Sequence, residues 1–264
     1  MSRNRPALII FFLVFVSILR IFSNAADATI SAEVFVKLVE RGTLKEIKAA
    51  IVNGANANAK DSWGYPAIMV ATKRNDPRII SALIEAGADV NAVNDSGVTA
   101  LMYAVMQDDK LNIISELIRH GADVNAKNLD GVTVLMYAAH GIYGHKNPQV
   151  KIMSELIRQG ANVNDKDRCG KTVLMYAALN VYDDRQIFPV LIEAGSDVNE
   201  KDDMGVTAVM FAAMQNSVKG TSELLRLGAD VNAVDSMGMT ALSYAVSSNH
   251  QEVISLLKKA GAKD

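Results

Sequence analysis

Gly131–Ala139 reads GVTVLMYAA, and close copies of this stretch recur along the chain. Every copy keeps the glycine, a threonine two residues later and an aromatic residue at the seventh place. A motif that returns at near-constant spacing indicates an array of packed structural units. The copies are GVTALMYAV (Gly97–Val105), GKTVLMYAA (Gly170–Ala178), GVTAVMFAA (Gly205–Ala213) and GMTALSYAV (Gly238–Val246).

A second motif, GADVNA with small changes, lies ahead of each copy. Its glycine stands ten residues before the glycine of the copy, as Gly87 stands before Gly97. The onward distance varies, from 23 residues (Gly64 to Gly87) to 29 residues (Gly131 to Gly160). The constant part is rich in Gly, Asn and Asp, so it predicts a β-turn finger opened by a helix-ending glycine. The variable part predicts two short helices joined by a turn that tolerates insertions.

Local signals predict where these helices begin. The first helix of a unit is expected to start at a threonine whose hydroxyl accepts a backbone N–H. Second helices are expected to begin at Asp76-Pro77 and Asn147-Pro148, where a capping side chain precedes a proline. Pro189 is expected about five residues inside a second helix, where it would kink the helix or loosen its first turn. The capping threonines are Thr99, Thr133, Thr172, Thr207 and Thr240.

This repeated unit resembles the ankyrin repeat, and the resemblance covers residues 27–264. It implies an all-α ankyrin-repeat solenoid of helix-turn-helix units joined by β-turn fingers. Where the family has Thr-Pro-Leu-His, this chain has methionine in place of the histidine, so methionine packing is expected to replace the histidine hydrogen bonds. The expected units are an N-terminal capping repeat (27–59), five repeats (60–92, 93–126, 127–165, 166–200 and 201–233) and a C-terminal capping repeat (234–264).

The expected capping repeats close the array at both ends. Ser31–Gly54 predicts two helices without a finger ahead of them, the second starting with a capping box at Thr43 and Glu46. In the last unit, Lys258 stands at a position that is Ile or Leu in the preceding units. A terminal unit needs such a polar residue because no neighbour covers it.

Residues 1–25 have the layout of a secretory signal peptide. Arg3 and Arg5 precede an apolar run over Ala7–Leu19, and Ser23-Asn24-Ala25 supplies small residues for cleavage. An uncleaved N-terminal anchor is the alternative, because apolar residues continue beyond Arg20. Both interpretations predict export, with the repeats periplasmic or secreted, or held outside the cytoplasm by the anchor. Without the leader, 24 Lys and Arg face 29 acidic residues, a net charge of −5 that offers no basic stripe for nucleic acid.

No catalytic or metal constellation emerges from the sequence. Gly170-Lys171-Thr172 imitates the end of a P-loop, but Asp165 stands where the motif needs glycine. His140 and His145 are the one close histidine pair and have no accompanying Cys or carboxylate, so a solvated loop is expected rather than a metal site. Cys169 is expected to be an inert finger residue, with a reactive thiol as the alternative. We therefore expect no enzyme activity, no cofactor and no metal.

One aromatic position recurs in the first helices. In GVTVLMYAA, Leu135 is the expected buried anchor, and Tyr137 lies about 200° from it on the helix, which predicts a side chain directed away from the core. Tyr and Trp at rigid exposed positions are typical of binding hot spots. The alternative is that the rings pack between units and stiffen the array. The expected protein-binding residues are Trp63, Tyr65, Tyr103, Tyr137, Tyr143, Tyr176, Tyr182, Phe211 and Tyr244.

The resemblance implies a non-catalytic protein–protein interaction module. The expected contacts are the concave groove, lined by first helices, and the turns between helices, where units carry extra residues (Gln107–Asp109, Gly141–Gln149 and Tyr182–Arg185). The alternative function is an inhibitor or immunity-type protein that occludes a co-exported enzyme. We expect a monomer whose partner is a protein, without nucleic acid, and with membrane contact only through an uncleaved leader.

Overall fold

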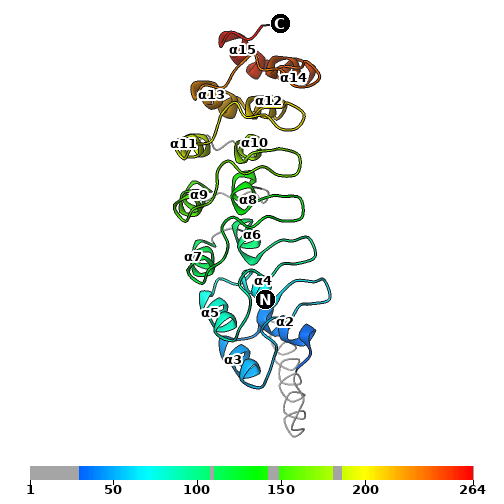
Figure 1. The fold of residues 1–264 in the computed structure, drawn as a ribbon, viewed down its shortest axis with the longest axis vertical. Coiled ribbons are helices and arrows are strands. Elements are labelled where there is room, and N and C mark those ends of the chain that lie inside the picture. Colours follow the sequence, from blue (N-terminus) through cyan, green and yellow to red (C-terminus); the bar gives the residue numbers. More distant parts are fainter. Residues whose placement is uncertain (1–29, 108–109, 142–148, 181–185, 264) are drawn as a thin grey trace, which may run out of the picture.

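The helices of this chain form two parallel columns. The computed structural model describes residues 30–107, 110–141, 149–180 and 186–263, and these contain fourteen helices and no extended strand. Figure 1 shows the columns, with loops projecting on the side of the first helices. The first helices are α2 (Ala32–Arg41), α4 (Ala67–Ala71), α6 (Ala100–Val105), α8 (Val134–His140), α10 (Val173–Ala178), α12 (Ala208–Met214) and α14 (Ala241–Ser247); the second helices are α3 (Leu44–Val52), α5 (Pro77–Glu85), α7 (Leu111–Arg119), α9 (Gln149–Arg158), α11 (Ile187–Glu193), α13 (Val218–Arg226) and α15 (Gln251–Lys259).

Each expected unit contains one first helix and one second helix, while the unit boundaries themselves stay a prediction. The first helices α4, α6, α8, α10 and α12 are short and largely buried, as in α10, where Val173, Leu174 and Met175 are at most 2% exposed. Ala177 and Ala178 are buried as well. Small side chains let neighbouring first helices approach closely, and one continuous core runs the length of the stack.

The threonine caps are confirmed in three units and absent in two. Thr99 accepts the amide of Met102 at 3.2 Å, and Thr133 and Thr240 form the same bond in their own units. The hydroxyls of Thr172 and Thr207 are buried and have no hydrogen-bond partner in the described part of the chain. The cap prediction is therefore wrong at these two positions, although both threonines still begin their helices.

Methionine occupies the place of the family's histidine, as predicted, and it does more than pack. Met136 is 1% exposed, and its Sδ accepts the backbone N–H of Thr133 at 3.5 Å. Met175 and Met210 accept from Thr172 and Thr207 in the same way, at 3.4 and 3.5 Å. Sulfur is a weak acceptor, but it satisfies an amide that the helix leaves without an intrahelical partner.

The second helices begin largely as expected. Asp76 accepts the amide of Arg78 at 3.1 Å with Pro77 at the first helical position, and Thr43 and Glu46 form the predicted capping box. Pro189 is the third residue of α11, not the fifth, because this helix starts only at Ile187. Proline is tolerated there, since the first turn needs no intrahelical amide donor. Asn147-Pro148 lies outside the described residues.

In each finger, one Asn or Asp side chain accepts two backbone amides and closes the turn. In the third repeat, Asn128 Oδ1 accepts the amides of Asp130 and Val132 at 2.9 and 2.8 Å, which closes the turn. Gly131 has a φ of +79°, and a Cβ there would lie 3.0 Å from the backbone nitrogen of Arg168. Glycine is therefore required both by the backbone conformation and by the next finger, whose Arg168 amide donates to the Asp130 carbonyl.

A ladder of asparagines ties successive units together. Asn91 Nδ2 donates to the Gly121 carbonyl at 3.3 Å, and its Oδ1 accepts the Asp123 amide at 2.8 Å. Asn164 makes neither bond within the described residues, although it occupies the same place in GANVND. The step from the third repeat to the fourth therefore lacks this link. The equivalent pairs are made by Asn58, Asn125, Asn199 and Asn232.

The last helix, α15, exposes polar residues and buries apolar ones. Lys258 and Lys259 are exposed in α15, whereas Val253 and Leu257 of the same helix are fully buried. No helix in the described ranges is long and apolar enough to cross a membrane. The expected leader, residues 1–25, lies outside those ranges.

Candidate interaction surface

The recurring aromatic residues lie in the angle between a first helix and its finger. We call this surface the inner face, meaning the side of α4, α6, α8, α10, α12 and α14 that is turned toward the fingers (Figure 1). The Tyr176 hydroxyl donates to Asp167 Oδ2 at 2.8 Å, and the Tyr244 hydroxyl bonds Asp235 in the same way. In the third repeat, Asn128 donates to the Tyr137 hydroxyl at 2.9 Å.

These bonds give the aromatic position a structural function. Asp167 uses Oδ1 to accept the amides of Cys169 and Lys171 and uses Oδ2 to accept the Tyr176 hydroxyl. One carboxylate thus closes the turn of the finger and fixes the finger to the helix. Burial, together with the bond to Asp167, raises the pKa of Tyr176, and the bond to Asp235 raises the pKa of Tyr244 to about 12.

The prediction that these side chains point away from the core is wrong. Tyr103, Tyr137, Tyr176 and Tyr244 are half-buried and pack against the core, and Phe211 is only 9% exposed. The helical angle sets Tyr137 away from Leu135, but the finger folds back over the helix and its Asn128 bonds the Tyr137 hydroxyl. The tyrosine side chains are therefore partly accessible to a partner, while the Phe211 side chain is buried.

The first finger carries the most exposed of the expected contact residues that the structure describes. Trp63 is 77% exposed at the tip of the first finger, a large apolar side chain in water. Tyr65 lies edge-on to Tyr103 of the next repeat, with ring centroids 6.2 Å apart and an interplanar angle of 68°. The remaining two expected contact residues, Tyr143 and Tyr182, fall outside the described residues, as do most of the extra residues of the inter-helix turns.

The central part of the inner face contains a residue that sequence reasoning missed. Lys171 follows Gly170, at a place where the other fingers carry Tyr65, Val98, Val132, Val206 and Met239. Its Nζ lies 5.6 Å from the ring centroid of Phe211 in the next repeat. Aligning the units on their glycines could have revealed this exception, because Lys171 is the one charged residue in that column.

His140 lies beside this lysine, at the end of α8. Its ring is edge-on to Tyr176, with centroids 5.7 Å apart and an interplanar angle of 88°. Burial lowers the pKa of His140, and the Lys171 cation lowers it further.

His145 lies outside the described residues, and the part of the chain that is described contains no cluster of three His, Cys, Asp or Glu side chains able to hold a metal. Cys169 is exposed at a fingertip.

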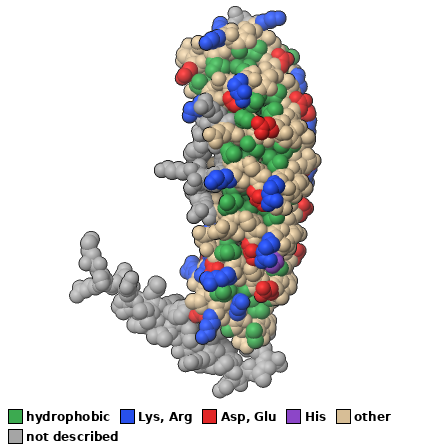
Figure 2. All heavy atoms as spheres, turned by 90° about the vertical axis from the view of Figure 1, so that its left-hand side faces the viewer, with side chains coloured by type: hydrophobic (Ala, Val, Ile, Leu, Met, Phe, Trp, Pro, Cys, Tyr) green, Lys and Arg blue, Asp and Glu red, His purple; other side chains and the backbone are tan. Residues whose placement is uncertain are grey.

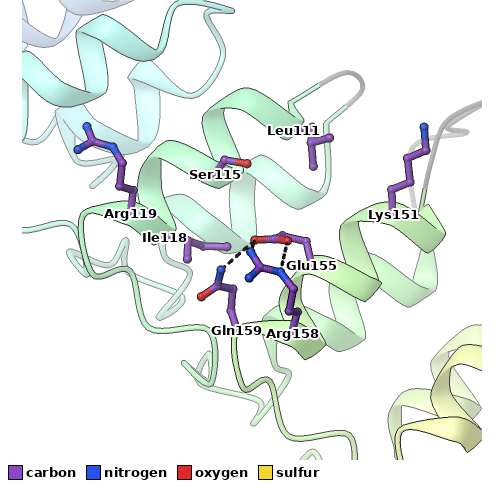
Figure 3. A pocket seen from close by; sticks show the side chains of 8 residues that line it. All are labelled: Leu111, Ser115, Ile118, Arg119, Lys151, Glu155, Arg158 and Gln159. Atoms are coloured by element: carbon purple, nitrogen blue, oxygen red, sulfur yellow. Dashed lines mark hydrogen bonds and ion pairs between the residues drawn. The ribbon is translucent and has the colours of Figure 1, made fainter.

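On the opposite surface, formed by the second helices, three arginines pair with glutamates of their own helices. Figure 2 views this side and shows apolar patches alternating with basic and acidic side chains along the stack. Arg119 bonds Glu116 and Arg158 bonds Glu155, each at 2.7 Å. A hollow lies between α7 and α9, where Gln159 and Arg158 both bind Glu155 while Lys151 and Arg119 point outward (Figure 3).

Most of the charged groups that line the hollow are held by neighbours on their own helices. Glu155 is satisfied by its own helix, and the apolar lining is limited to Leu111 and Ile118. The Glu116 carboxylate faces the preceding repeat, where Ser81 donates to it. The second-helix side therefore has the character of a solvated outer surface.

Comparison with known proteins agrees with the architecture. A family model described as ankyrin repeats (3 copies) matches residues 35–128, 106–202 and 181–264. The chain belongs to the ankyrin-repeat family. Members of this family generally mediate protein–protein interactions, and the family is typically non-catalytic. A search of curated proteins found no match.

Proposed function

We propose that this chain is an exported interaction protein that binds a protein partner through its inner face and fingers. The observation that supports this most is the contrast between the two sides of the stack. The fingers carry Trp63 and the Lys171 cation beside the partly accessible tyrosine rings of the inner face, whereas on the second-helix side Arg119 and Arg158 pair with glutamates of their own helices. Aromatic and cationic side chains on a rigid support favour protein recognition.

Rigidity supports the same conclusion. In the third, fourth and last units an Asx side chain joins the finger to its helix. Backbone bonds link successive fingers from the second to the last, and asparagine bonds such as that of Asn91 link the units except at the step from the third to the fourth. A preorganised surface loses little conformational entropy when it binds. The array therefore presents its contact residues at fixed spacing without first having to order them.

The proposal is tested by chemical cross-linking and purification of the full chain from cells that express it, with two variants in parallel. Trp63→Ser copies the residue that the next finger has at this place, Ser96, and is expected to weaken recovery of the partner without unfolding the array. Lys151→Glu, on the second-helix side, is expected to leave recovery unchanged. The proposal is wrong if Lys151→Glu abolishes recovery and Trp63→Ser does not. Recovery of one enzyme in an inactive state would instead favour the inhibitor function.

Export is tested separately. The apolar run over Ala7–Leu19 supports a leader, and we propose cleavage after Ala25, with the anchor as the alternative. Alkaline phosphatase fused behind residue 264 is expected to be active, because this reporter needs a compartment outside the cytoplasm. N-terminal sequencing of the mature chain is expected to begin at Ala26. An inactive fusion, with the full chain recovered from the cytoplasm, would exclude export.

A further inference from the structure

Lys171 is a charged residue at a position that the other fingers fill with apolar or aromatic residues. The residue after the glycine of the GVTVLMYAA-type motif is apolar or aromatic in every other finger, and Val98, Val132 and Val206 are 7–8% exposed there. A half-buried lysine at this position has lost part of its hydration. Local rules of a fold are typically broken at functional sites.

The position has a defined neighbour in the next repeat. Tyr65 lies edge-on to the Tyr103 ring, and Lys171 lies over the Phe211 ring at 5.6 Å, so the residue after the glycine packs on the aromatic of the following unit. Phe211 is also the one aromatic of the series without a hydroxyl. A lysine over an aromatic face gains a cation–π contact, which holds its ammonium group in place.

In the part of the chain that the structure describes, the ammonium group of Lys171 lacks an acidic partner. Among the described residues, no carboxylate lies within ion-pair distance of Lys171 Nζ. The carboxylate of its own finger, Asp167, is already occupied by two backbone amides and the Tyr176 hydroxyl. Burial lowers the pKa of His140, which disfavours a second positive charge beside Lys171.

We infer that Lys171 is the recognition point for an acidic side chain carried by an extended peptide segment of the protein partner. The segment would lie along the inner face, with its carboxylate on Lys171 Nζ and apolar neighbours on the accessible sides of the Tyr137 and Tyr176 rings. Charge complementarity selects the occupant, because an ion pair formed next to the Phe211 ring is less screened than one in open water. This inference rests on the proposed function and specifies the chemistry of its partner.

The chain offers well-matched variants for a test. Lys171→Val restores the residue that three other fingers have at this place, so the variant is expected to fold at least as well as the parent chain. Lys171→Glu reverses the charge at the same point. Lys151→Glu makes an equal change of charge on the second-helix side and serves as the control. Circular dichroism and the thermal midpoint verify that each variant is folded.

The probe is a phage-displayed library of random linear peptides, selected on the full chain. Peptides rich in Asp or Glu beside apolar residues are expected to be enriched. Synthetic copies are expected to bind Lys171→Val and Lys171→Glu at least about tenfold more weakly, and Lys151→Glu with unchanged affinity. Selection on Lys171→Glu is expected to enrich basic peptides instead.

Three outcomes would overturn the inference. If the selected peptides bind Lys171→Val as tightly as the parent chain, the acidic recognition point is wrong while the inner face can still be the binding surface. If they lose affinity only for Lys151→Glu, the second-helix side binds and the proposed function is wrong as well. If no linear peptide is enriched on the parent chain, the site does not take an extended segment.

Discussion

The hydroxyl of Tyr176 donates to Asp167, nine residues earlier in the chain, and Tyr244 pairs with Asp235 at the same spacing. In both units the aspartate also accepts two amides of its own finger. A single carboxylate thereby joins the turn of the finger to the first helix. The aromatic position is a component of the scaffold, and the tyrosine side chains there are only partly accessible to a partner.

The fifth repeat offers a test of this scaffold function, because Phe211 leaves Asp202 without the hydroxyl that the neighbouring units supply. Asp202 is 9% exposed, and its Oδ1 accepts the amides of Met204 and Val206 at 2.9 and 2.8 Å. Phe211→Tyr adds a donor toward this carboxylate. We expect it to raise the free energy of unfolding by about 1 kcal/mol in urea denaturation.

The converse substitution is the control. Tyr176→Phe removes the donor from Asp167 and leaves a half-satisfied carboxylate, so a loss of about 1–2 kcal/mol is expected. If Tyr176→Phe costs nothing, the hydroxyl bond does not stabilise the finger. The gain expected for Phe211→Tyr would then lose its physical basis.

The asparagine ladder predicts a difference between two chemically identical substitutions. Asn91→Ala removes two bonds to the next repeat, whereas Asn164→Ala removes none of these bonds in the described structure. We expect Asn91→Ala to lower the free energy of unfolding by about 1–3 kcal/mol and Asn164→Ala to change it by less than about 0.5 kcal/mol. Equal losses at both positions would show that the third and fourth repeats are linked by the same ladder as the others.

Alkaline titration tests the tyrosine pairs directly. The bond to Asp235 exists only while Tyr244 is protonated, so its pKa rises from 10.0 to about 12. Because the pKa is raised in the folded state, the stabilisation is fully present below pH 10 and is lost as the pH rises through about 12. Tyrosinate absorbance should show a late step that Tyr244→Phe reduces. Ionisation of every tyrosine near pH 10 would contradict this assignment.

We expect protonation of Glu116 to lower the free energy of unfolding at acidic pH. Its pKa is lowered from 4.5 to about 2, chiefly because Arg119 donates to it and also because Ser81 does, while burial acts in the opposite direction. A lowered pKa in the folded state means that the stabilisation is present above pH 4.5 and disappears as the pH falls through about 2. The difference in urea midpoint between the parent chain and Glu116→Gln should therefore be constant above pH 4.5 and shrink below it. A difference that does not depend on pH would exclude the ion pair as its cause.

The sequence alone predicts the architecture well because its signals are local. Two glycines ten residues apart, such as Gly87 and Gly97, mark a finger whose turn needs a positive φ at each of them. Threonine caps and buried alanines then place the first helices within a few residues. Met136 was correctly assigned to the place of the family's histidine, although its bond to the Thr133 amide was not foreseen.

The character of the surface was harder to predict because it depends on contacts between segments. A helical projection places Tyr137 opposite Leu135 but contains no information about the finger, where Asn128 bonds to the Tyr137 hydroxyl. In the sequence, Lys171 is notable only as part of an apparent P-loop, Gly170-Lys171-Thr172. Its contact with Phe211 crosses from one repeat to the next, so a motif read within one unit does not reveal it.

The central claim is that a protein partner binds the inner face and fingers. Photo-cross-linking tests it most directly, with a benzophenone amino acid placed once at Trp63 and once at Lys151 in the full chain. Both side chains are exposed, so the two positions differ in the side of the stack that they report. The account predicts a cross-linked partner from Trp63 and none from Lys151. A cross-link from Lys151 with none from Trp63 would place the partner on the second helices and contradict it.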